Sequence, residues 1–89
     1  TAAALTANDW IWSAPADRME AELDAGGIHV GAKYRYRQKD QAATLTRSAD
    51  GQMLLTFDEP QRAIAPGQAV VVYRDDVVLG GGTVTAAIK

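Results

Sequence analysis

The residues with the clearest chemical potential are four cations at every second position, Lys33, Arg35, Arg37 and Lys39. Side chains two residues apart on a strand share a face and lie roughly 6.5–7 Å apart, close to the spacing of phosphates along one nucleic-acid strand. No acidic residue interrupts the run. The pattern is typical of a surface that binds a polyanion, although a strand face that only presents solvated charges has the same pattern.

Aromatic and amide side chains accompany these cations. The stretch Tyr34-Arg35-Tyr36-Arg37-Gln38 combines groups that hydrogen-bond phosphates with groups that stack on bases, a mixture typical of RNA-binding surfaces. A second stretch, Ala65-Pro66-Gly67-Gln68, predicts a tight turn of the type II kind, because proline stands at its second position and glycine at its third. Gln68, at the exit of this rigid turn, is well placed to present its amide to a ligand.

The sequence offers little for catalysis or for metal binding. His29 is the only histidine, there is no cysteine, and no serine or aspartate stands in a recognisable arrangement with His29. The acidic pairs Asp58-Glu59 and Asp75-Asp76 fall in expected turns, whereas a metal site needs a cluster of ligands. We therefore expect neither a catalytic residue nor a metal ligand in this chain.

Composition limits the class of protein. Eighty-nine residues, 47% of them hydrophobic, suffice for one domain with one modest core. The absence of cysteine excludes a disulfide scaffold, and we see neither a signal peptide nor an apolar run near the roughly 20 residues of a membrane span. A net charge of −2 argues against a free-standing nucleic-acid-binding protein, but four of the nine basic residues lie in 33–39. An auxiliary binding surface fits both observations.

Alternation of apolar and polar residues predicts the strands that would position these stretches. In the strand Ile28–Arg37 the apolar residues, Tyr34 and Tyr36 included, would face the core. The other expected strands are Ala43–Arg47, Gln52–Phe57, an apolar central strand Ala69–Tyr73 buried on both sides, Val77–Leu79 and Thr83–Ile88. Asp50-Gly51 predicts a hairpin turn, Asp58–Gln61 a loop, and Gly80–Gly82 a bend or a close approach of backbones. Roughly six to eight short strands with almost no helix predict an all-β sandwich or barrel.

The first part of the chain is harder to interpret. Residues 1–9 are rich in alanine and threonine, and we expect a linker remnant of a longer polypeptide, with the domain beginning at Trp10. Trp10 and Trp12 would share a strand face and anchor the chain to the core, or alternatively stack on bases.

Two structures compete for the next segment. Asp17 and Glu20 form the pattern of a helix capping box, and Gly26-Gly27 that of a helix stop, so a short helix over Arg18–Ala25 is possible. Because Met19, Ala21 and Leu23 also alternate, a strand fits equally well.

Five motifs occur in a distinctive order and at distinctive gaps. They are Arg35-Tyr-Arg-Gln38, Phe57-Asp-Glu-Pro60, Ala63-Ile-Ala-Pro-Gly-Gln68, Val72-Tyr73 and Leu79-Gly-Gly-Gly82. In this arrangement the chain resembles, from about Trp10 to Val84, the C-terminal β-barrel domain of the bacterial tRNA-specific 2-thiouridylases. Ala14–Gly27 departs from the family pattern and would be an insertion or a divergent loop.

The resemblance implies a fold and a parent enzyme. Residues 10–89 would form a small six-stranded antiparallel barrel, similar to the second domain of translation elongation factors. The parent would be a cytoplasmic enzyme that uses ATP to place sulfur on C2 of the wobble uridine of certain tRNAs. In that family an N-terminal domain binds ATP with magnesium through a Ser-Gly-Gly-x-Asp-Ser loop and carries two catalytic cysteines, neither of which is present in this chain.

By motif match, the resemblance also implies that Arg35, Tyr36 and Gln68 contact tRNA. The partners would be tRNA, the parent catalytic domain and a sulfur-relay protein, without membrane attachment. In the alternative, the barrel does not bind RNA but packs on the catalytic domain or docks a sulfur-donor protein. Arg35 and Gln68 on opposite sides of the molecule, or Arg35 in an internal ion pair, would contradict the RNA-binding interpretation.

Overall fold

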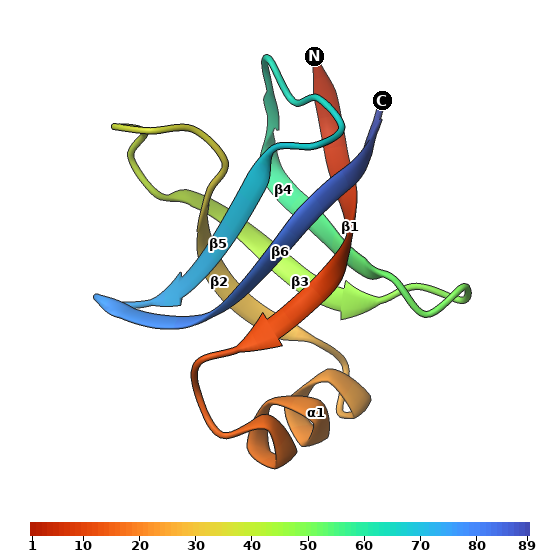
Figure 1. Ribbon diagram of the computed structural model, residues 1–89, viewed down its shortest axis with the longest axis vertical. Coiled ribbons are helices and arrows are strands. Elements are labelled where there is room, and N and C mark those ends of the chain that lie inside the picture. Colours follow the sequence, from red (N-terminus) through yellow and green to blue (C-terminus); the bar gives the residue numbers. More distant parts are fainter.

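Six antiparallel strands close into a barrel in the computed structural model, which describes residues 1–89 (Figure 1). The elements are β1 (Ala2–Trp12), α1 (Ala16–Asp24), β2 (Ile28–Lys33), β3 (Gln41–Arg47), β4 (Met53–Gln61), β5 (Ala69–Arg74) and β6 (Val77–Ile88). Around the barrel the order is β1-β4-β3-β2-β5-β6, and β6 pairs back onto β1. The predicted all-β six-stranded barrel is confirmed, and its closure leaves no open sheet edge.

The core fills the inside of the barrel and is closed at one end by α1. Every strand contributes buried aliphatic residues, among them Leu5, Val30, Leu45, Leu55, Val70 and Val84. Met19 and Leu23, one helical turn apart on α1, are buried in the same cluster. The two termini lie together at the other end (Figure 1).

Strand β1 corrects the expectation of a linker over residues 1–9. Ala2, Ala4, Leu5 and Ala7 are buried, and β1 pairs with both β4 and β6. The prediction was wrong because small residues give no clear alternation, although they fit the crowded interior of a narrow barrel. The domain therefore includes the first residues of the chain.

The segment after Trp12 is a helix rather than a strand. The predicted capping box is absent, since the N-cap is Pro15 without a side-chain hydrogen bond and Asp17 lies inside the first turn. The predicted glycine stop is confirmed by the positive φ angles of Gly26 and Gly27, 122° and 114°. With nine residues, α1 has neither the length nor the apolar character of a helix that crosses a membrane.

Strands β4 and β6 run further than predicted. β4 continues through Gln61, and Pro60 falls where the register with β1 shifts, a place where a missing N–H is tolerated. β6 passes without a break through Gly80–Gly82. A Cβ on Gly82 would lie 2.5 Å from the carbonyl oxygen of Asn8, so these glycines allow the close backbone approach that the sequence predicted.

Strand β5 alternates instead of being buried on both sides. Val70 and Val72 point into the core, whereas Val71 and Tyr73 are half-buried on the outside of the barrel. The prediction was wrong because a small closed barrel has only one interior. The outward residues of β5 become part of the surface described next.

Candidate functional site

The segment after β2 is a turn and not the continuation of a strand. β2 ends at Lys33 rather than at Arg37 as predicted, because the next backbone groups bond locally. The Tyr34 N–H donates to Gln38 Oε1 at 2.8 Å, and the Gln38 N–H donates to the Arg35 carbonyl at 3.4 Å. Arg37 has a φ of 64°, in the left-handed region. The Gln38 side chain thus closes a tight loop that carries the cations.

This turn separates the two tyrosines that were expected to share the core face. Tyr34 is buried and packs edge-on against Phe57, with ring centroids 5.9 Å apart. Tyr36 is 90% exposed, so the prediction that it faces the core was wrong. Arg37 lies over one face of the Tyr36 ring, and the other face is accessible to a ligand.

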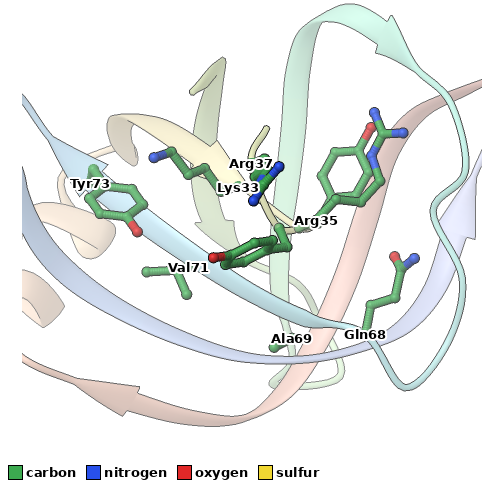
Figure 2. Close-up of a pocket in the computed structure, with 9 residues that line it drawn as sticks. Lys33, Arg35, Arg37, Gln68, Ala69, Val71 and Tyr73 are labelled. Carbon is green, nitrogen blue, oxygen red and sulfur yellow. The ribbon is translucent and has the colours of Figure 1, made fainter. Parts of the chain in front are cut away.

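A hollow of about 490 Å³ lies beside this turn on the outside of the barrel (Figure 2). Its lining consists of Lys33, Tyr34, Arg35, Tyr36, Arg37, Gln68, Ala69, Val71 and Tyr73, and we call it the basic hollow. In Figure 2 Lys33 lies near Tyr73 at one end of β5, and Arg35 lies toward Gln68 at the other end of the same strand. Three cations and no acidic residue line a surface that is otherwise apolar, aromatic or amide.

Each cation of the basic hollow lies over an aromatic ring. The distances to the ring centroids are 5.2 Å for Lys33 Nζ over Tyr73, 5.3 Å for Arg35 Cζ over Tyr34 and 5.5 Å for Arg37 Cζ over Tyr36. Such contacts at exposed sites contribute about 0.5–1 kcal/mol each. They orient the cations without using the N–H groups that would bind an anion.

Two of these cations are free of carboxylate partners. Lys33 Nζ lies 3.5 Å from Asp40 Oδ1, but Arg35 and Arg37 take part in none of the three ion pairs. Arg35 therefore is not locked in an internal ion pair, and it lines the same hollow as Gln68. Neither arrangement that would have contradicted the RNA-binding interpretation is found.

The other ion pairs fasten α1 to the barrel. Arg47 and Arg74 each contact a helix carboxylate at 2.6 Å, on Glu20 and Glu22 respectively. The Trp12 indole N–H, with Arg47 as a further partner, lowers the pKa of Glu20, and Arg74 lowers the pKa of Glu22. Arg47 and Arg74 are thus paired with carboxylates, unlike Arg35 and Arg37 of the basic hollow.

The Gln68 amide is engaged by its own loop. Its Nε2 donates to the Ala63 carbonyl at 3.0 Å, and its Oε1 accepts the Ala65 N–H at 3.1 Å. Gly67 has a φ of 92°, which confirms the predicted Pro-Gly turn. One amide N–H and one lone pair remain unused by these bonds. Gln68 therefore shapes the loop first and has only part of its amide left for a ligand.

Sequence reasoning missed two wall residues of the hollow and the role of Gln38 beside it. Gln38 acts by closing the turn, whereas Val71 and Tyr73 form a wall of the hollow from the outer face of β5. Period-two alternation starting from Val70 would have identified both wall residues. Nothing in the sequence pattern marks the bond made by the Gln38 side chain.

The family model described as the aminomethyltransferase β-barrel domain matches residues 2–84. The chain belongs to this family. The match begins within β1, in agreement with a barrel domain that includes residues 2–9.

Curated relatives confirm the resemblance to the tRNA-specific 2-thiouridylases that the five motifs indicated. The tRNA-specific 2-thiouridylase MnmA of Ralstonia pickettii (strain 12J) is 52% identical over 63 residues, 71% of this chain and 17% of the relative. The protein of that name from Lacticaseibacillus paracasei is 45% identical over 86 residues, 97% of this chain and 21% of the relative. That of Francisella tularensis subsp. novicida is 51% identical over 71 residues, 80% of this chain and 17% of the relative. The chain thus spans about a fifth of the length of the curated relatives it matches.

Proposed function

We propose that this barrel is the tRNA-contacting accessory domain of an ATP-dependent tRNA 2-thiouridylase, which adds sulfur to C2 of the wobble uridine. The observation that carries the proposal is the basic hollow, which Arg35, Tyr36 and Gln68 line together with two more cations and no acidic residue. The names of relatives that are 45–52% identical support tRNA as the nucleic acid.

Each of the three residues has a distinct role in this proposal. Arg35, which has no carboxylate partner, donates to a backbone phosphate with the edge of its guanidinium. Tyr36, 90% exposed, stacks on an unpaired base. Gln68 holds the loop and offers its remaining N–H or lone pair to the RNA.

The chemistry of sulfur transfer belongs, in this proposal, to parts of the parent protein that are not in this chain. ATP with magnesium and the sulfur-carrying groups act in the catalytic domain, and this barrel helps to hold the tRNA. The parent acts in the cytoplasm, and the barrel has the catalytic domain as its neighbour.

A second candidate function has an observation of its own. Ile11, Val77 and Val78 are 73%, 61% and 40% exposed on the paired strands β1 and β6, and none of them lines the basic hollow. Exposed apolar side chains favour a protein contact. In this alternative the barrel does not bind RNA but packs on the catalytic domain or docks a sulfur-donor protein.

Filter binding of a tRNA transcript with a wobble uridine tests the first proposal. We expect weak binding by the 89-residue chain that falls steeply with salt, and weaker binding by Arg35→Ala. Arg18→Ala is the matched control, because Arg18 is an exposed arginine on α1 that makes no ion pair and lies outside the basic hollow. Equal binding by wild type and Arg35→Ala, or no binding by either, would contradict the assigned site.

A further inference from the structure

A second hollow adjoins the basic hollow at Arg35, the one residue that both share. It measures about 500 Å³, and its lining is polar or charged apart from Pro60. We call it the polar hollow, and its polar and charged lining residues are Arg35, Gln38, Lys39, Gln41, Glu59, Gln61 and Arg62. Because it lacks aromatic side chains, this site suits a sugar-phosphate group better than a base.

A buried hydrogen-bond network gives the polar hollow its shape. Gln61, 8% exposed, donates through Nε2 to Gln41 Oε1 at 3.1 Å. The Tyr34 hydroxyl lies 2.9 Å from Gln61 Oε1 and 2.8 Å from the Arg62 carbonyl, and its single hydrogen is shared between these two acceptors. Tyr34 also directly precedes Arg35 in the turn. The network thus joins the segment that carries Arg62 to the turn that carries Arg35, so both cations face one surface.

The charges of the polar hollow are unbalanced. Its cations are Arg35, Lys39 and Arg62, none of which forms an ion pair, and Glu59 is its one acidic residue. Together the two hollows hold five of the nine basic residues of the chain, namely Lys33, Arg35, Arg37, Lys39 and Arg62. Unpaired positive charge therefore continues from one hollow into the other.

We propose that the polar hollow is a second phosphate-binding subsite, in which Arg62 and Lys39 bind the sugar-phosphate backbone that passes over Arg35. The inference rests on the proposed function. It adds Arg62 and Lys39 to the three residues already proposed to contact tRNA. Bases stack on the Tyr36 side, and the backbone continues on the Arg62 side. Glu59 limits the affinity, since its carboxylate repels a phosphate.

A salt series of tRNA binding tests this subsite. We expect Arg62→Ala to weaken binding about 3- to 5-fold at low salt, the upper range for an exposed ion pair. The slope of log affinity against log salt should become shallower by about 0.7–0.9, the loss of one phosphate contact. Lys39→Ala should act in the same direction, Arg62→Lys should keep most of the binding, and Arg18→Ala should match wild type.

Glu59→Gln supplies a test that does not depend on a loss of function. Removal of the only acidic side chain in the polar hollow should raise the affinity for the tRNA transcript and steepen its salt dependence. Arg62 enters the buried network only through its backbone carbonyl, so Arg62→Ala should keep its urea unfolding midpoint.

The outcomes separate the subsite from the proposed function. If Arg35→Ala is impaired while Arg62→Ala, Lys39→Ala and Glu59→Gln all behave like Arg18→Ala, the second subsite is wrong and the proposed function stands. If wild type does not bind the transcript at low salt, both are wrong.

Discussion

Replacement of Gln68 by alanine should weaken the fold and RNA binding together, because the Gln68 side chain holds the loop beside the basic hollow. The change removes the bond from Nε2 to the Ala63 carbonyl and the bond from the Ala65 N–H to Oε1. Each intramolecular hydrogen bond contributes about 0.5–1.5 kcal/mol, and exposed ones lie at the low end because water replaces them. We therefore expect the free energy of unfolding to fall by about 1–2 kcal/mol.

Backbone strain favours a rearrangement of the loop in this variant. Ala63 has a φ of 61°, a conformation that costs a residue with a Cβ on the order of 1 kcal/mol. Without the two hydrogen bonds of the Gln68 side chain, this residue no longer restrains Ala63. We expect the loop to relax away from the geometry of the wild type. The remaining side chains of the hollow would then lose their neighbour across the cleft.

Urea unfolding followed by the fluorescence of Trp10 and Trp12, with filter binding on the same samples, measures both effects. Gln68→Glu is an informative companion, because it keeps the acceptor for the Ala65 N–H, loses the donor to Ala63 and adds a negative charge to the basic hollow. We expect the unfolding free energy of Gln68→Glu to lie between those of Gln68→Ala and wild type. Its RNA binding should nevertheless be weaker than that of Gln68→Ala, because of the added negative charge. An unchanged unfolding free energy in Gln68→Ala combined with lost binding would refute the loop-shaping role and assign the amide to direct RNA contact.

Three further predictions concern other parts of the barrel. Tyr36→Ala should weaken tRNA binding by roughly 5- to 150-fold in a filter assay whereas Tyr36→Phe should not, since stacking needs only the ring; equal loss in both would contradict stacking. Gly82→Ala should lower the unfolding free energy in urea by about 1–3 kcal/mol, because its Cβ would meet the Asn8 carbonyl at 2.5 Å, and unchanged stability would contradict that contact. Hydrogen bonds from Ser48 and Gln52 lower the pKa of Asp50 to about 2 from 3.8, so wild type should lose unfolding free energy as the pH falls from about 4 to 2. This loss at low pH should be smaller in Asp50→Asn. If the unfolding free energies of wild type and Asp50→Asn depend identically on pH, the role assigned to Asp50 is refuted.

Much of the barrel follows from local pattern. The β3–β4 hairpin was predicted from alternation and from Asp50-Gly51, and Gly51 indeed has a φ of 87°. The Pro-Gly turn was predicted as well, because these two residues impose their own backbone angles. The strand over residues 1–9 was not predicted, because a run of small side chains becomes a strand only through pairing with β4 and β6 on both sides.

The candidate site shows where alternation fails. β2 pairs with β3 as far as Ala32 and with β5 as far as Lys33, and beyond these residues it has no ladder partner. The Gln38 side chain then takes the Tyr34 N–H, and the turn exposes Tyr36. A periodic pattern cannot report where partner strands end. Lys33, Arg35 and Arg37 do share one surface, but they reach it through a turn and not along a strand face, and Lys39 lines the neighbouring hollow.

The most direct measurement of the central claim is an NMR titration of the 15N-labelled 89-residue chain with the tRNA transcript. We predict amide shift changes in residues 33–37 and 68–73, the two segments that supply the lining of the basic hollow, with little change around Ile11 and Val77. Changes confined to Ile11 and Val77, or no change at low salt, would contradict an RNA-binding surface built around Arg35.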